Sequence, residues 1–440
     1  MQSKFVLKVV AGLLGASALL CAQGQVTAVR AGRMFDPKAG QMVTNQVILI
    51  QGDRITEVGP AASVTIPANA KVIDLSRASV LPGLIDGHVH LTDQPGGLQH
   101  QMMVAMNSAT RSLNAGYTTQ VVMGSHGGGY ADVELKRAIQ QGLVKGPRLV
   151  TAGPIIGITA PGNAFYPLEF KPFEPEIIAD GPEALRAAVR QLAHYGAEHV
   201  KIHTTGRFYF KPNGEMVNAA LGSRDELMAI VDEAHRRGMW VASHTYGGDG
   251  LKWAIEAGID NIQHATAATD EDIRNIVAKN LPITTTTLDH RQDEPGDLKN
   301  WPGYSRWRAV QPTWKKMMEA GVKLGWGSGA GPVTNGQGRI YDKTCNCSHG
   351  VQGEMFPIFV SWGATPVYTL RMATTVNAEI IHMQDSIGTI EKGKFADLVG
   401  VAGDPLQDIT EMQKVKFVMK GGDVMKDELT TANGALRSAN

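Results

Sequence analysis

Residues 81–90 read LPGLIDGHVH and decide the fold. The stretch begins as a short apolar strand and ends in two histidines that are two positions apart. Because alternate side chains of a strand point to the same face, His88 and His90 can present two imidazoles to one ion. An apolar strand that ends in such residues is typical of the carboxyl-terminal mouth of a parallel barrel, where active sites are assembled.

From this strand onward, apolar runs alternate with helical patterns. Strands are predicted at residues 80–85, 118–123, 148–152, 199–203, 240–243, 261–263, 282–287 and 323–327. Capping boxes at Ser223 with Glu226 and at Thr269 with Asp272 mark where two of the intervening helices begin. Eight βα units predict an α/β protein with a (β/α)8 TIM barrel over residues 81–384. The alternative is a doubly wound open sheet, but no G-x-G-x-x-G follows the first strand.

Short apolar stretches separated by turn residues lie on both sides of this alternating region. They occupy residues 25–80 and return in residues 385–425. Such a texture at both ends predicts one small β-sandwich built from the two termini. Residues 426–440 are expected to form a flexible C-terminal tail.

The first 24 residues have the layout of a cleaved secretory signal. Lys4 and Lys8 give a short positive region, and residues 9–20 form an apolar segment that is too short for a membrane span. A small residue, Ala22, follows before the expected cleavage site. We expect residues 1–24 to be a signal peptide and the mature protein to be periplasmic or secreted; an N-terminal anchor or buried helix is the alternative.

The balance of positive and negative residues indicates which classes of binding partner to expect. Lysine plus arginine and aspartate plus glutamate number 42 each, and no long run of one sign occurs. Proteins that bind nucleic acid or anionic lipid carry a basic patch or stripe. We therefore expect a small-molecule substrate, no nucleic acid and no membrane partner after signal cleavage. A homo-oligomer is compatible with the sequence, which also leaves open whether Cys345 and Cys347 pair.

Together with later segments, residues 81–90 resemble the strand-1 metal motif of the amidohydrolase superfamily. Residues 196–202 (GAEHVKI) resemble its strand-4 lysine segment, residues 242–247 (ASHTYG) its strand 5, and residues 261–265 (NIQHA) its strand 6. Residues 388–399 (GTIEKGKFADLV) are similar to the family's closing β segment. The resemblance is nearest to the Xaa-Pro dipeptidase and imidazolonepropionase-like branch, which includes ochratoxin-type amide hydrolases.

The resemblance implies a dinuclear metal centre. His88 and His90 would bind one divalent cation, with Zn2+ as the expected metal, and His244 and His264 would bind a second. Lys201, carboxylated by CO2 to a carbamate, would bridge the two ions. A buried, uncompensated ammonium is costly, which agrees with such a modification. A lysine paired with a nearby carboxylate is the alternative.

Two such cations lower the pKa of a bridging water and polarise a carbonyl. The implied reaction is therefore hydrolysis of a C–N amide or dipeptide bond by the bridging hydroxide, in an Xaa-Pro-like dipeptide or an N-acyl amino acid. Tyr246, two residues after His244, is the candidate for a hydrogen-bond donor to the substrate. A packed aromatic side chain is the alternative at this position.

One position departs from the family pattern. Strand 8 of the superfamily ends in an aspartate, and residues 325–331 read GWGSGAG, with Gly329 at the aspartate position. Glycine neither binds a metal through a side chain nor accepts the proton of the attacking water. General acid–base groups contribute about 10²–10⁴-fold, so we expect impaired activity. Asp289, His290 and Asp342 are candidates for a displaced base.

Three function classes stay open at this point: a working dinuclear amidohydrolase, a catalytically silenced binding protein on the same scaffold, and a mononuclear deaminase-type enzyme. Lys201 argues against the last class, because such sites lack a bridging carbamate. Turnover before and after Gly329→Asp separates the first two. His126 and His203 are further histidines near strand ends, and we expect them to line the site as polar side chains.

Overall fold

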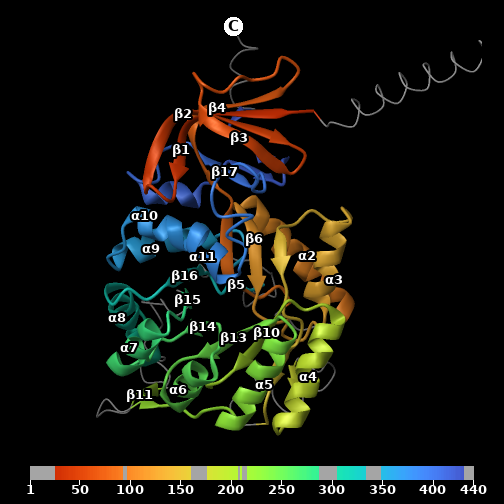
Figure 1. Ribbon diagram of the computed structural model, residues 1–440, viewed down its shortest axis with the longest axis vertical. Helices are drawn as coiled ribbons and strands as arrows, with labels where there is room; N and C mark the ends of the chain where they lie inside the picture. The colour runs from red at the N-terminus through yellow and green to blue at the C-terminus, as the bar shows by residue number, and fades with distance from the viewer. Residues whose placement is uncertain are drawn as a thin grey trace, which may run out of the picture.

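The computed structural model describes residues 25–92, 97–159, 176–206, 209–210, 216–286, 305–332 and 348–430. These residues form two bodies, a β-sandwich and beneath it a barrel surrounded by helices (Figure 1). The first and last strands of the chain lie together in the sandwich (Figure 1).

The sandwich is a single seven-stranded sheet. Its strands are β1 (Thr27–Asp36), β2 (Gln41–Gln51), β3 (Arg54–Pro60), β4 (Lys71–Pro82), β17 (Leu398–Val401), β18 (Phe417–Lys420) and β19 (Asp423–Asp427), in the order β19-β18-β17-β4-β1-β2-β3. The N- and C-terminal parts join where β17 pairs antiparallel with β4, with Val399 opposite Leu81. At the far edge of the sheet, the Ile55 amide donates to the Lys394 carbonyl at 2.9 Å, so the sheet curls around its own apolar core.

This arrangement confirms the β-sandwich predicted from both termini. Its limits differ slightly from the prediction. Strand β19 continues to Asp427, two residues beyond the predicted end at 425, because it completes the edge of the sheet beside β18. Strand β4 continues to Pro82 and leads directly into the first barrel strand.

The barrel consists of parallel strands in chain order. They are β5 (Leu84–Val89), β6 (Tyr117–Val122), β7 (Arg148–Val150), β8 (Ile155–Gly157), β10 (His199–His203), β13 (Trp240–Thr245), β14 (Asn261–His264), β15 (Ile283–Thr286) and β16 (Leu324–Gly327). The third barrel strand is interrupted: β7 pairs with β6, and β8 pairs with β10 and with the short β9 (Glu176–Ile178). The ring closes where Val89 bridges Ala330. The TIM barrel is thereby confirmed, and the open-sheet alternative is wrong.

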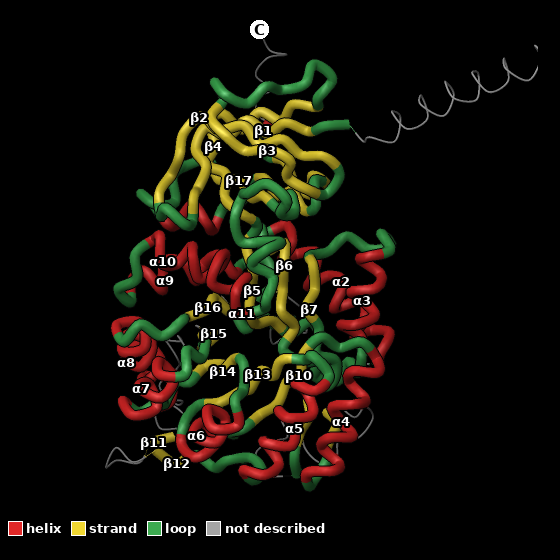
Figure 2. The backbone as a smooth tube through the Cα atoms, viewed as in Figure 1, coloured by secondary structure: helices red, strands yellow, loops and turns green. Residues whose placement is uncertain are grey.

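Helices surround the barrel (Figure 2). They are α2 (Leu98–Asn114), α3 (Ala131–Gln140), α4 (Pro182–Tyr195), α5 (Arg224–Arg236), α6 (Gly248–Ala257), α7 (Asp270–Ala278), α8 (Ser305–Glu319), α9 (Met355–Ser361), α10 (Pro366–Arg371) and α11 (Asn377–Ile380), with β11 (Tyr209–Phe210) and β12 (Met216–Val217) as a small hairpin. Both predicted capping boxes are present, at Ser223 and at Thr269. None of the helices described is long and apolar enough to cross a bilayer.

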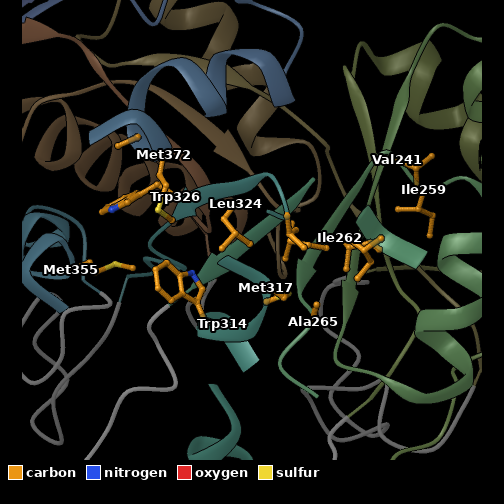
Figure 3. Packing of buried hydrophobic residues seen from close by; sticks show 14 of the residues in the cluster. Val241, Ile259, Ile262, Ala265, Trp314, Met317, Leu324, Trp326, Met355 and Met372 are labelled. Carbon is orange, nitrogen blue, oxygen red and sulfur yellow. The ribbon is translucent and has the colours of Figure 1, made fainter. Parts of the chain in front are cut away.

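The alternation of side chains along the strands separates two apolar layers. Val200 and Ile202 of β10, like Val241 of β13, belong to the large core that packs against the helices. Figure 3 shows part of this core, with Val241 near Ile259. Burying each such side chain contributes about 1.5–3 kcal/mol. Because successive residues of a strand face opposite sides, Lys201 is placed on the inner face of the barrel.

Candidate active site

The residues predicted to bind metal lie at or next to the carboxyl ends of four parallel strands. These residues are His88 and His90 from β5, Lys201 from β10, His244 from β13 and His264 from β14. In a closed parallel barrel these strand ends meet at one mouth, which is why residues distant in sequence come together.

Six histidine side chains form a closed ring at this mouth, which we call the histidine ring. The distances between neighbouring ring centres are 5.1 Å for His88–His90, 4.6 Å for His90–His126, 6.4 Å for His126–His203, 4.8 Å for His203–His244, 4.6 Å for His244–His264 and 5.2 Å for His264–His88. The histidine ring contains all four histidines that were predicted to bind metal, together with His126 and His203.

The pair from β5 is oriented by hydrogen bonds on its outer side. Nδ1 of His88 lies 2.7 Å from Oε1 of Gln263, and Nδ1 of His90 lies 3.4 Å from the Gly124 carbonyl oxygen. Both oxygens only accept, so each Nδ1 carries the proton and each Nε2 carries a lone pair. The two Nε2 atoms face each other at 3.1 Å. Two facing lone pairs repel each other unless a cation lies between them.

This separation matches a shared ion. Two imidazole nitrogens bound to one Zn2+ at about 2.0–2.1 Å lie roughly 3–3.4 Å apart. The second pair has a similar spacing, with Nδ1 of His244 3.0 Å from Nε2 of His264. The outer nitrogen of His264 is 3.1 Å from the Thr286 hydroxyl. Both pairs therefore suit binding of one divalent ion each.

The backbone at the second pair is held in an unusual conformation. His264 has φ +77° and Ala265 has φ +49°, in the left-handed region that residues with a Cβ rarely adopt. Such positions cost on the order of 1–3 kcal/mol and cluster at functional sites. The strain turns the chain sharply at the end of β14, where the His264 ring meets His244.

The electrostatics of the site favour neutral imidazoles. Burial, followed by the charge of Lys201, holds the pKa of His88 and of His203 well below the ordinary value. Burial and neighbouring imidazoles do the same to the pKa of His90 and of His244. Lys201 itself is 1% exposed. The neutral form is the one that binds metal, so the histidines are in the state that a metal site needs.

The donor set is not complete by itself. Within the described ranges, no group of three or more His, Cys, Asp or Glu side chains is arranged to hold one ion. Each histidine pair therefore needs a further ligand. The assignment of the four histidines and Lys201 as metal ligands stays a prediction.

Gly329 lies beside the first pair. Its amide donates to the His88 carbonyl at 2.7 Å, and it is buried with φ +61°. The preceding residue, Ser328, donates from its hydroxyl to Asp86 Oδ2 at 2.6 Å and from its amide to Oδ1 at 3.0 Å. The end of β16 is thus fixed against β5, with the Gly329 backbone next to that of His88.

Several residues that orient the site were missed by the sequence analysis. Gln263 accepts from His88, and Asp86 holds the end of β16; burial raises the pKa of Asp86 to about 7. His349 Nδ1 lies 2.8 Å from the Ser112 hydroxyl, and its Nε2 donates to the His90 carbonyl at 2.9 Å. Asp86 and Gln263 lie within the motifs at residues 81–90 and 261–265, which is the one signal that pointed to them.

Tyr246 is buried beside the second pair. Its ring packs edge-on against His244 at 4.6 Å between ring centres and lies 5.4 Å from that of His264. This position agrees with a side chain that lines the site, while its role toward substrate stays a prediction. Asp289, His290, Asp342, Cys345 and Cys347 lie outside the described residues.

Comparisons with known proteins agree with this geometry. Ochratoxinase from Aspergillus niger is 24% identical over 438 residues, covering 92% of this chain and 87% of that protein. The structure of a Xaa-Pro dipeptidase with bound methionine is similar, with a TM-score of 0.78, 27% identity, and coverage of 91% of this chain and 100% of the other. A prolidase complexed with N-methylphosphonate-L-proline gives a TM-score of 0.76, 27% identity, and coverage of 92% and 100%. The sequence also matches the amidohydrolase family over residues 79–425, which contain the whole barrel and the histidine ring, and the chain therefore belongs to that family.

Proposed function

We propose that this protein is a metal-dependent hydrolase that cleaves a C–N amide or dipeptide bond in a small molecule, with two divalent metal ions at the barrel mouth. The observation that carries the proposal is the 3.1 Å separation of the Nε2 atoms of His88 and His90, whose Nδ1 atoms both lie near oxygen acceptors. Zn2+ is the metal that neutral imidazole ligands at this spacing suit.

The ligands divide between the two ions. His88 and His90 would hold the first ion, His244 and His264 would hold the second, and Lys201 would contribute as a CO2-derived carbamate. A buried ammonium would be repelled by divalent cations at this site, whereas a carbamate would be an anion with oxygen donors. Divalent ions in such a site polarise a carbonyl and lower the pKa of water.

The protein's own groups orient the reactants. Gln263 and Gly124 fix the imidazole orientation at the first pair, as outer hydrogen-bond partners of metal-binding histidines do. Tyr246 packs beside the second pair, and we propose that its phenol donates a hydrogen bond to the carbonyl oxygen or the carboxylate of a substrate. We propose an Xaa-Pro-like dipeptide or an N-acyl amino acid as substrate class, because the relatives named above act on prolyl dipeptides or ochratoxin.

Gly329 lowers the expected rate. Gly329 supplies no side-chain carboxylate where the family pattern has an aspartate, and general acid–base groups contribute about 10²–10⁴-fold. The same observation favours a second candidate function, a silenced binding protein that retains the scaffold and binds the substrate without cleaving it.

The test is a hydrolysis screen of Xaa-Pro dipeptides and N-acyl amino acids with added Zn2+, together with metal content per chain. We expect wild type to bind two ions per chain and to turn over slowly. Lys201→Ala should lose both the bound metal and the turnover. Lys145→Ala, at an exposed position, is the control and should change neither quantity. Metal-free protein after reconstitution would refute the proposal. Two ions with substrate binding but no turnover, even in Gly329→Asp, would favour the silenced binding protein.

A further inference from the structure

We propose that His349 is a positioning residue of the active site, which holds the main chain of His90 in place from the side of helix α2. It does so through a series of hydrogen bonds that joins Gln352, Ser112, His349 and the His90 carbonyl, which we call the outer hydrogen-bond chain. This inference rests on the proposed metal-dependent function, because its effect is read at the first histidine pair.

The groups in the outer hydrogen-bond chain fix the direction of each bond. The His90 carbonyl only accepts, so Nε2 of His349 carries a proton and donates it across 2.9 Å. A charged imidazole is costly at this fully buried position, so Nδ1 carries a lone pair and accepts from the Ser112 hydroxyl at 2.8 Å. That hydroxyl oxygen in turn accepts from Nε2 of Gln352 at 2.7 Å. One tautomer of His349 therefore satisfies every contact of its ring.

The segment that carries His349 is tied to its surroundings on two sides. The His349 carbonyl accepts from Nε of Arg111 in the last turn of α2 at 2.9 Å. The preceding residue, Ser348, forms a bridge with Gly331, just after β16. Both Ser348 and His349 are buried. The imidazole is thus held by a fixed frame, which a group that positions another residue needs.

The outer hydrogen-bond chain also reaches the other histidine of the first pair. Nε2 of Gln352 lies 3.4 Å from Oδ2 of Asp86. The other oxygen of that carboxylate accepts from the His88 amide at 3.2 Å. The main chain of both histidines is therefore contacted from outside the barrel, that of His88 by Asp86 and that of His90 by His349.

His90 depends on this support more than His88 does. The His88 ring is held by a short contact, 2.7 Å from Nδ1 to Gln263, whereas Nδ1 of His90 lies 3.4 Å from the Gly124 carbonyl, beyond the usual range of an N–H···O bond. A binding site must hold its ligands within about 0.5 Å of the productive geometry. The carbonyl contact with His349 supplies a restraint that the ring of His90 itself lacks.

The test compares His349→Gln with His349→Asn, because the two amides replace different nitrogens of the imidazole. Glutamine extends about as far as Nε2 and keeps a donor for the His90 carbonyl, whereas asparagine ends near Nδ1 and keeps only the contact with Ser112. The affinity for each bound Zn2+ is measured by competition with a chromophoric chelator, and His90→Ala identifies the first ion. We expect His349→Asn to lower the affinity for that ion about 10–100-fold and to leave the other ion unchanged. His349→Gln should retain most of the affinity, and the exposed His100→Ala should match wild type.

The outcomes separate this inference from the proposed function. Wild type that binds no metal after reconstitution would defeat the proposed function itself. Two tightly bound ions in wild type, with equal affinities in His349→Gln and His349→Asn, would leave that function standing and overturn the positioning role, because a side chain that only fills space does not distinguish the two amides. Urea denaturation of the metal-free variants shows whether each one folds. If either does not, Ser112→Ala decides: it frees Nδ1 of His349 and should weaken binding of the same ion, and an unchanged affinity would overturn the inference.

Discussion

Gly329 has a buried, left-handed backbone and donates its amide to the His88 carbonyl. Aspartate tolerates this backbone region better than most residues, so a carboxylate can be restored there at a cost of about 1–2 kcal/mol or less. The added group would act mainly in the transition state. We expect Gly329→Asp to raise kcat by on the order of 10²-fold or more with a smaller change in KM.

Steady-state kinetics on a cleaved dipeptide or N-acyl amino acid measures this effect. Gly331→Asp is the matched control, because position 331 faces open space two residues away and has an ordinary φ. It should leave kcat unchanged. No gain in Gly329→Asp would show that another residue already accepts the proton. Equal gains in the two variants would show that the effect is not specific to position 329.

Gln263 acts on the metal through His88. Removing its oxygen with Gln263→Leu leaves the buried Nδ1 proton of His88 without an acceptor and frees the ring to turn. We expect metal affinity to fall about 10–100-fold, the usual effect of losing such a partner. Competition with a chromophoric chelator measures it. Gln263→Glu keeps an oxygen acceptor and is expected to retain most of the affinity; equal losses in both variants would contradict the positioning role.

At the scale of elements, a side chain from helix α3 binds the backbone amides at the break in the third barrel strand. Asp132, in the first turn of α3, accepts from the amides of Ala152 and Gly153 at 3.1 and 2.9 Å, between β7 and β8. These amides would otherwise be buried without a strand partner. The Gly153 carbonyl in turn accepts from the amide of Ser125, which links this segment to the one that carries His126.

Burial raises the pKa of Asp132 from its ordinary value to about 6. The native state then holds the proton more tightly than the unfolded state. Asp132 therefore makes its full contribution to the free energy of unfolding below about pH 4, and this contribution is lost as the pH rises through about 6. The loss amounts to on the order of 3 kcal/mol. We expect the free energy of unfolding to fall between pH 4 and 7 more steeply in wild type than in Asp132→Asn, as measured by urea denaturation. Parallel pH profiles would disprove the assignment.

At the scale of the whole molecule, one cluster fastens the sandwich to the barrel. Arg148 of β7 donates to Asp397 at 2.6 Å, and its guanidinium lies 3.9 Å from the centre of the Phe395 ring. Arg54 of the sandwich covers the same ring at 3.5 Å. The closing segment that resembles the family's β motif is therefore the place where the two bodies meet.

Arg148→Ala would leave the buried Asp397 carboxylate without its cation. We expect the free energy of unfolding to fall on the order of 3 kcal/mol, as when one partner of a buried pair is removed. Chemical denaturation followed by tryptophan fluorescence measures it. Arg54→Ala, which removes a more exposed stacking partner, should cost clearly less; a larger loss in Arg54→Ala would reverse the ranking of the two contacts.

The sequence by itself determined the barrel, the sandwich from both termini and the order of the metal-binding candidates, because strand alternation and helix caps are local patterns. It also showed that position 329 lacks a carboxylate. Only the tertiary structure decided which distant side chains meet. His88 contacts Gln263 across 175 positions and Asp86 holds Ser328 across 242. Such contacts exist because the barrel closes, and closure brings separate strand ends to one mouth. The sequence placed His126 and His203 near strand ends, but their contacts with the other four histidines in the histidine ring follow from that closure.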